Sequence, residues 1–401
     1  MASVLEDVLV AGAGMTPFGK FPDRGLKELA SVAAAEALGD AKLAAADVDA
    51  VFFANATGGL VTGQEMIRGQ TALRETGLLG IPIFNVENAC ASASSAFHLA
   101  WMSVACGQYE VALAIGAEKL VHPDKQRSFD ALGAGIDLER RAELERFVYG
   151  GDGAPQGAPG SIFMDIYAEL ARRYMDESGA TAADFARVAV KNHRHGALNP
   201  KAQYRDEVTA AEVLGSRMVS DPITLLMCSP IGDGAAALVL CSPERARHSG
   251  ADAVRVCGSA LVSGTDDGPP AAVRAAQRAY EQAGLGPEDL DVVELHDAAA
   301  PAELQIYEEL GLCAQGGGPA LLASGDTELG GRVPVNPSGG LLSKGHPVGA
   351  SGCAQLVELT DQLRGRAGAR QVEGARTALA ENAGGFLGPD HAAAGVTILS
   401  R

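Results

Sequence analysis

The chain has 401 residues, 47% of them hydrophobic and 20% charged, a balance typical of folded globular proteins and not of disordered ones. Its 50 acidic and 32 basic residues give a formal net charge of -18, which argues against binding to nucleic acid or to an anionic membrane surface. The length exceeds one ordinary core, so we expect two core-bearing units or one large composite domain.

The seven cysteines include no Cys-x-x-Cys pair, so neither a disulfide scaffold nor a zinc site is expected. The sequence has no run of 18 apolar residues that would predict a membrane span. Residues 1–7 lack the basic start of a signal peptide. We therefore expect a cytoplasmic, reduced chain with no metal and no membrane contact.

The first 53 residues predict a strand, a helix and a second strand. Residues 8–14 form an apolar run that ends in glycines, about 26–38 read as a helix, and 47–53 form an acidic turn that leads into a strand. The pair Gly12 and Gly14 lacks the third glycine and the acidic ribose ligand of a dinucleotide-binding loop, so that interpretation is disfavoured.

Cys90 lies at a strand-to-helix turn. Residues 81–86 are strand-like, and a helix of small residues then runs to about residue 107. A cysteine in this position faces the positive end of the helix dipole, which should lower its pKa and favour the nucleophilic thiolate. The alternative is a buried cysteine that only fills space.

Residues 121–220 differ from the rest of the chain in charge. They contain 13 Lys/Arg and 15 Asp/Glu, a net charge of -2, which leaves -16 for the remainder. They also contain a long helical stretch near 162–177. The segment is either an ordinary surface insertion or the place where an anionic ligand docks on an otherwise repelling protein.

The second half of the chain repeats the order of the first. Residues 254–258 read as a strand, 271–283 as a helix and 289–295 as an acidic turn with a strand. Residues 378–384 loosely resemble the earlier strand-like stretch 112–117. This ordered self-similarity predicts two α/β units of like topology packed into one body.

Three further positions could carry chemistry. His296 ends a predicted strand, where α/β sheets usually place reactive groups, and Asp297 could orient its imidazole or cap the next helix. His346, between glycine and proline, could accept a thiol proton or could belong to a helix-capping loop. The paired glycines Gly384 and Gly385 could direct backbone N–H groups at a substrate oxygen, although such turns are common.

Together these stretches resemble the thiolase superfamily, and most closely the sterol-carrier-protein type thiolases. The matching stretches, in family order, are Asn88–Ser92, Gly116–Leu120, Lys191–His195 with Asn199–Pro200, Cys228–Ala236, Glu294–Asp297 and Ser343–Pro347.

The resemblance implies an α/β thiolase fold with five layers, αβαβα, built from two similar halves. It implies an N-terminal half from residues 1–120 and 221–250, a loop domain at 121–220 that meets coenzyme A, and a C-terminal half at 251–401. It also implies a homodimer.

The family's roles transfer position by position. Cys90 would carry the acyl group as a thioester, His346 would activate Cys90, and His296 would line the oxyanion site of the second substrate. Backbone N–H groups of Cys90 and Gly384 would form the other oxyanion hole. No metal or redox cofactor is implied, since the coenzyme A thioester is the substrate.

The second catalytic cysteine is missing from both of its usual places. Asn382 starts the stretch where many thiolases have Cys-x-Gly, and Ala298 follows the His-Asp pair where sterol-carrier types have cysteine. Cys313 and Cys353, in helix-like context, are expected to be structural. Loss of a positioned general base typically costs ~10²–10⁴-fold in rate, so acylation of Cys90 looks intact while the usual condensation looks impaired.

The leading hypothesis is a ping-pong acyltransferase that uses acyl-CoA or an acyl-carrier-protein thioester. His346 or His296 could replace the missing base, decarboxylation of a malonyl-type thioester could supply the nucleophile, or the acceptor could be a different nucleophile. The alternatives are thiolytic or retro-aldol cleavage of a C–C bond, or a non-catalytic subunit. Some relatives work with a small OB-fold partner protein, and such a partner is possible here.

Overall fold

The computed structural model describes residues 6–150 and 161–401. These residues form one nine-stranded sheet, with helices on its outer faces and between its two halves. The strand order is β3-β2-β4-β7-β1-β8-β11-β10-β9. Two half-sheets meet between β1 and β8, which pair only through Leu9–Arg255 and Val10–Val254. The signal-peptide prediction concerns residues 1–7, of which 1–5 lie outside the described part.

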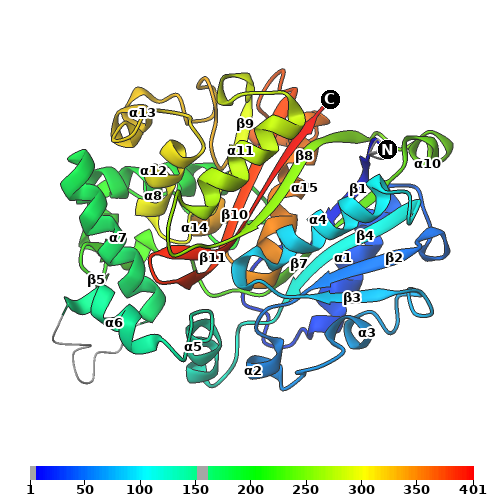
Figure 1. The fold of residues 1–401 in the computed structure, drawn as a ribbon, viewed down its shortest axis with the longest axis horizontal. Helices are drawn as coiled ribbons and strands as arrows, with labels where there is room; N and C mark the ends of the chain where they lie inside the picture. Colours follow the sequence, from blue (N-terminus) through cyan, green and yellow to red (C-terminus); the bar gives the residue numbers. More distant parts are fainter. Residues whose placement is uncertain (1–5, 151–160) are drawn as a thin grey trace.

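The N-terminal half begins with alternating strands and helices and is interrupted by a helical segment (Figure 1). Its first elements are β1 (Leu9–Met15), α1 (Leu26–Asp40), β2 (Ala50–Ala54), α2 (Gly58–Thr62), α3 (Arg68–Ala72), β3 (Ile83–Val86), α4 (Ser92–Ala105) and β4 (Val111–Glu118). The helical segment comprises α5 (Lys125–Gly133), α6 (Arg141–Tyr149), α7 (Ile162–Ser178), α8 (Ala182–Ala197) and α9 (Ala210–Gly215). A small hairpin of β5 (Met218–Ser220) and β6 (Ile223–Thr224) precedes the return strand β7 (Gly234–Cys241).

The C-terminal half follows the linking helix α10 (Pro243–Ser249). Its elements are β8 (Val254–Ser263), α11 (Ala271–Ala283), β9 (Val292–Glu294), α12 (Ala300–Glu309), α13 (Gly318–Ser324), α14 (Gly340–Ser343), α15 (Ser351–Leu363), β10 (Thr377–Leu387) and β11 (Asp390–Ser400). The predicted repeat of strand, helix, acidic turn and strand is confirmed, because β1, α1 and β2 correspond in order to β8, α11 and β9. Cys353 lies in α15 as expected, whereas Cys313 lies between α12 and α13, so the helix prediction there is wrong.

Three buried hydrophobic clusters lie between the five layers, and the second of them contacts both half-sheets. In the first, α1 covers the outer face of the N-terminal half-sheet, with Leu29 packed among residues of β2 and β4. In the second, α4 and α15 lie between the two half-sheets and contribute Phe97 and Leu356. In the third, α11 and α12 cover the outer face of the C-terminal half-sheet. This order confirms the expected five-layered αβαβα architecture.

Equivalent glycines allow a helix to approach a strand closely in both halves. A Cβ atom on Gly12 of β1 would lie 2.1 Å from the carbonyl oxygen of Ala37 in α1. A Cβ atom on Gly258 of β8 would lie 2.6 Å from the carbonyl oxygen of Ala279 in α11. Both helices thus sit against their strand at a distance that only glycine permits.

Within residues 6–150 and 161–401, no helix combines the length and the apolar character needed to cross a bilayer.

Candidate active site

Cys90 lies in a single 3-10 turn, Ala89–Ala91, between β3 and α4. Ala89 has a φ of 48°, in the left-handed region, which turns the chain sharply into the helix. The next five residues, 92–96, are all Ser or Ala and buried, so the turn packs deep in the central layer. Cys90 is buried, with 8% of its surface exposed.

His346 contacts Cys90 although 256 residues separate them in the chain. Its Nε2 lies 3.2 Å from the Cys90 sulfur, and its Nδ1 lies 2.7 Å from the hydroxyl of Ser351 at the start of α15. Ser351 donates its own proton to the carbonyl oxygen of Pro347, so its hydroxyl oxygen accepts from Nδ1–H. This chain of hydrogen bonds places the lone pair of Nε2 toward the thiol.

Burial disfavours the charged forms of both the thiol and the imidazole. Burial raises the pKa of Cys90 to about 12, and the carboxylate of Glu118 raises it further. Burial lowers the pKa of His346 to about 3, with a smaller effect of the ammonium of Lys344. The expected lowering of the Cys90 pKa by the helix dipole is therefore wrong, because desolvation and a nearby carboxylate outweigh that local field.

His296 follows the end of β9 and lies beside His346. Its ring centre lies 5.2 Å from that of His346, at 72° to it, and burial lowers its pKa well below the usual value. Both ring nitrogens are buried and have no hydrogen-bond partner among the described residues. Asp297 does not orient this ring, because its carboxylate accepts from the N–H groups of Leu341 and Leu342 at the start of α14.

Asn382 and the glycines after it border the nucleophile. Asn382 falls on the face of β10 that carries Ala378 and Ala380, which pack against α4 and α15 in the central layer. Its amide nitrogen and oxygen are both buried, and neither bonds to any residue in the described ranges. Gly384 is pressed against the turn that holds the nucleophile, because a Cβ there would lie 2.4 Å from the carbonyl oxygen of Asn88.

The N–H group of Gly385, one residue beyond the predicted Gly384, lies against the sulfur. Together with the N–H of Cys90, it acts to lower the pKa of the thiol. Gly385 has a φ of +63°, and the pairing of β10 with β11 skips it, so its N–H is not used in the ladder. The oxyanion role of Gly384 stays a prediction.

Glu118 links the loop after β2 to the turn that follows His346. Its carboxylate accepts from Asn55 and Thr57 near α2 and from the N–H of Gly349, three residues after His346. Neither this residue nor Ser351 was expected from the sequence, although Gly116–Leu120 belongs to the matching stretches. A spacing of 28 residues in the sequence does not show that the carboxylate of Glu118 lies close enough to Cys90 to affect its pKa.

The side chains of Cys90, His296 and His346 lie close enough together to hold a metal ion. Their ligand atoms are all within 4.8 Å of one another, and one thiolate with two imidazoles is a set that suits Zn²⁺. The same three side chains form a nucleophile with adjacent bases. The prediction that the protein needs no metal stays a prediction.

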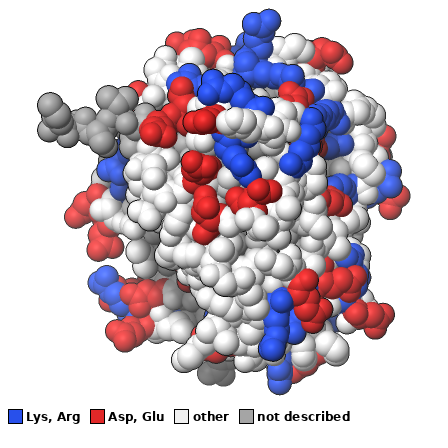
Figure 2. All heavy atoms as spheres, turned by 90° about the vertical axis from the view of Figure 1, so that its right-hand side faces the viewer, with Lys and Arg blue, Asp and Glu red and all other residues white. Residues whose placement is uncertain are grey.

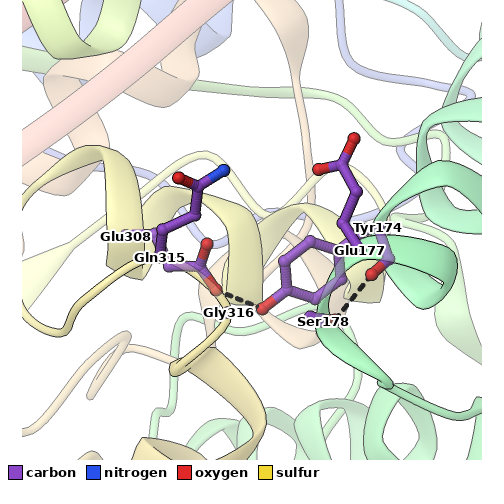
Figure 3. A pocket seen from close by; sticks show the side chains of 6 residues that line it. All are labelled: Tyr174, Glu177, Ser178, Glu308, Gln315 and Gly316. Carbon is purple, nitrogen blue, oxygen red and sulfur yellow. Dashed lines mark hydrogen bonds between the residues drawn. The ribbon is translucent and has the colours of Figure 1, made fainter.

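A hollow lies away from these residues, between the end of α7 and the loop after α12. It has a volume of about 270 Å³ and is lined by Tyr174, Glu177, Ser178, Glu308, Gln315 and Gly316. Figure 3 shows the hydroxyl of Tyr174 donating to Glu308, at 2.5 Å. The lining has no thiol or imidazole, so this hollow offers none of the chemistry found around Cys90.

Comparisons with known proteins place nearly the whole chain in one family. Residues 8–244 match the thiolase N-terminal domain and residues 254–401 match the thiolase C-terminal domain-like family. The chain is 39% identical to an acetyl-CoA acetyltransferase of Methanothermobacter thermautotrophicus, over 99% of this chain and 100% of that protein. It is 38% identical to benzoylsuccinyl-CoA thiolase subunit BbsB of Thauera aromatica, over 91% of each. It is 37% identical to sterol carrier protein 2 of Rattus norvegicus, over 95% of this chain and 70% of that protein.

The solved structures agree with this assignment. An Ltp2-ChsH2(DUF35) aldolase superposes with a TM-score of 0.80 at 29% identity, covering 100% of this chain and 99% of that one. Human mitochondrial 3-ketoacyl-CoA thiolase superposes with a TM-score of 0.70 at 19% identity, which supports the fold alone. With both family domains matched and relatives aligned along almost its full length, the chain belongs to the thiolase family, as its resemblance to the sterol-carrier-protein type implies.

Proposed function

We propose that the protein is a thiolase-type acyltransferase that carries its acyl group on Cys90. The observation that supports this most directly is the 3.2 Å contact between the Cys90 sulfur and Nε2 of His346. A thiol whose pKa is raised to about 12 needs a base at that distance to react at neutral pH. The hydrogen bond from Nδ1 to Ser351 leaves Nε2 free to serve as that base.

In the first half-reaction, the sulfur attacks the carbonyl carbon of an acyl-CoA or acyl-carrier-protein thioester while its proton moves to Nε2 of His346. The new C–S bond forms, the bond to the outgoing thiolate breaks, and the proton on His346 passes to that thiolate. In the second half-reaction, a bound acceptor takes the acyl group and Cys90 regains its proton. Atoms and charges balance without a metal or a redox cofactor.

Unpartnered polar groups around the sulfur supply stabilisation for the developing oxyanion. The N–H of Gly385 and of Cys90 face the sulfur, and the ring of His296 and the amide of Asn382 have buried polar atoms without partners in the described part. Buried polar atoms of this kind are costly unless a ligand or water satisfies them. Donors fixed in place before the substrate arrives are worth several kcal/mol in similar sites, typically about 3–4.

The experiment is incubation of the purified full chain with a panel of acyl-CoAs, followed by intact-protein and peptide mass spectrometry. We expect the acyl mass on the peptide that contains Cys90, lost in Cys90→Ala. Cys106, an exposed free cysteine, provides the matched control, since Cys106→Ala should acylate as the natural protein does. Full acylation of Cys90→Ala would contradict the proposal, and ligand binding without acylation would indicate a non-catalytic subunit.

Cleavage of a C–C bond is the second candidate, favoured by the similarity to an aldolase over the full chain and by Ala298 in the place of a second cysteine. Thiolysis of a 3-oxoacyl-CoA would release product only with free coenzyme A. Retro-aldol cleavage of a 3-hydroxyacyl-CoA would release product without it. Product analysis with and without free coenzyme A separates the two.

A partner protein is also proposed. One similar structure is an Ltp2-ChsH2(DUF35) aldolase and one relative is named as a subunit of a benzoylsuccinyl-CoA thiolase. A second copy of this chain is a further proposed partner, supported by exposed apolar side chains around the edge strand β3. These are Met66, Ile67, Leu79 and Phe84. The face shown in Figure 2, on the side of β2 and β3 in Figure 1, has a broad uncharged area below its centre.

A further inference from the structure

A histidine outside every motif discussed so far lies beside the active site. His391 is the second residue of β11, directly after the tight hairpin turn that β10 makes at Gly388-Pro389. Its ring centre lies 6.2 Å from that of His296, at 87° to it, and 4.5 Å from that of Phe386. The hairpin that follows the glycine pair thus places a third imidazole beside His296.

A hydrogen bond fixes the orientation and the tautomer of the His391 ring. Its Nδ1 lies 3.2 Å from the carbonyl oxygen of Gly385, the residue whose N–H faces the Cys90 sulfur. A carbonyl only accepts, so Nδ1 carries the hydrogen and Nε2 carries the lone pair. His391 is half-buried, and within the described ranges no hydrogen bond engages its Nε2.

The hairpin tip is also anchored from outside. The carboxylate of Asp390 accepts from the N–H of Thr265, from the N–H of Ala271 at the start of α11 and from the N–H of His391 itself. On the inner side, the N–H of Phe386 donates to the carbonyl oxygen of Gly135, after α5. A side chain held on both sides in this way is preorganised, as a catalytic group must be.

The position of His391 suits it to replace the missing second cysteine as a base. That base is absent both at Ala298 and at Asn382, and neither alanine nor asparagine can take a proton at neutral pH. Burial lowers the pKa of His391, so the ring is neutral and able to accept. The ring of His391 lies next to that of His296, which in turn packs against His346, the partner of Cys90.

We propose that Nε2 of His391 is the general base that removes the α-proton of the second acyl-CoA. The inference rests on the proposed acylation of Cys90. The α C–H proton moves to Nε2, and the resulting carbanion attacks the thioester carbonyl on Cys90. A C–C bond forms, the C–S bond to Cys90 breaks, and the thiolate of Cys90 takes up a proton through His346. His391 then returns its proton to solvent.

His296 is the rival base, because both of its ring nitrogens lack partners in the part of the chain that the structure describes. It lies deeper, with 1% of its surface exposed, and directly against His346. A ring in this place is suited to donate a hydrogen bond to the thioester oxygen of the second substrate. The two histidines therefore differ in role and can be separated by substitution.

The experiment measures two rates on the full chain: acylation of Cys90 by mass spectrometry, and deuterium incorporation from D₂O into the α-position of acetyl-CoA, propionyl-CoA and octanoyl-CoA. The decisive variant is His391→Asn, because the asparagine amide N–H takes the place of Nδ1–H and can still hold the Gly385 carbonyl. His391→Ala removes both functions. His122→Asn, at a histidine that bonds to the backbone of Asp124, is the matched control.

For His391→Asn we expect the ratio of exchange rate to acylation rate to fall ~10²–10⁴-fold, the usual effect of a lost general base. His391→Ala should lower the exchange rate equally and the acylation rate as well. The proposal is overturned if the natural chain acylates but exchanges no deuterium, if His391→Asn keeps its ratio, or if only His296→Asn lowers it. A chain that fails to acylate contradicts the proposed function instead, so the two failures are distinguishable.

Discussion

Each half-sheet joins two antiparallel neighbouring strands at an equivalent place, but the connecting segments differ in length and structure. In the N-terminal half, β4 leads to its antiparallel neighbour β7 through the helices α5 to α9. In the C-terminal half, β10 leads to its antiparallel neighbour β11 through a turn at Gly388-Pro389. The helical connection of the first half contacts the second half, because Tyr167 of α7 packs edge-on against Phe386 of β10, with ring centres 5.5 Å apart.

The comparison shows how a duplicated framework can hold an unsymmetrical site. The framework is repeated in detail: the carboxylate of Asp49 accepts from the N–H of Glu110 and Val111, and that of Asp291 accepts from the N–H of Arg376 and Thr377. The reactive groups are not repeated. The first half supplies the thiol, and the second half supplies the imidazoles.

The largest effect is expected from His346→Ala, which removes the base supplied by the second half and keeps the nucleophile supplied by the first. The acylation rate of Cys90 should fall ~10²–10⁴-fold, because the thiol then loses its proton acceptor. Rapid-quench mass spectrometry with the best acyl-CoA of the panel measures it. An unchanged rate would show that the N-terminal half acylates without help from the C-terminal half.

Alkylation of Cys90 by iodoacetamide tests whether the first half alone makes a reactive thiolate. Because the pKa is raised to about 12, the thiolate fraction and the rate should still rise about tenfold per pH unit between pH 7 and 9. Free cysteine, with a pKa of about 8.5, should level off over this range. Glu118→Gln should speed the reaction at a given pH, since it removes a negative charge near the sulfur. A plateau below pH 8 would contradict the raised pKa.

Gly384→Ala tests the contact where the second half presses on the turn of the first. The added Cβ would lie 2.4 Å from backbone atoms of Asn88 and Ala91, which cannot yield as a flexible side chain can. We expect a loss of about 1–3 kcal/mol in the free energy of unfolding, together with slower acylation. Gly133→Ala, at a helical glycine with open space around it, is the control and should be at least as stable. Urea denaturation measures both.

The smallest effect is expected where the halves are most alike. Asp49→Ala and Asp291→Ala should each lower the free energy of unfolding by about 1 kcal/mol, since each removes an acceptor of two backbone hydrogen bonds. Acylation should persist in both variants. A large difference between the two losses in parallel urea titrations would show that the halves are not energetically equivalent.

The sequence was sufficient to predict the elements that frame the site, because strand and helix periodicity is local. The helix at 271–283 agrees with α11 to the residue, and the strand at 81–86 overlaps β3. The prediction that Cys90, His296 and His346 meet in one site rests on the family resemblance. Their ligand atoms lie within 4.8 Å of one another, which agrees with that prediction.

What the sequence could not provide depends on distant contacts. The sign of the Cys90 pKa shift was wrong because burial and Glu118 are products of tertiary packing. His391 was missed because it stands in no motif, seven residues past Gly384 and beyond a turn. Its importance is visible only when the hairpin folds back and its ring meets the carbonyl of Gly385.

The contact between residues 90 and 346 has a consequence for biosynthesis. During translation, the sulfur emerges from the ribosome long before its imidazole partner, and α15 completes the central layer after most of the chain has been made. A nascent or truncated chain therefore carries an unassisted thiol, and competence to accept an acyl group is acquired only when the last third of the polypeptide has docked. Acyl transfer would thus report complete folding of the whole molecule, a late event for pairings so distant along the chain.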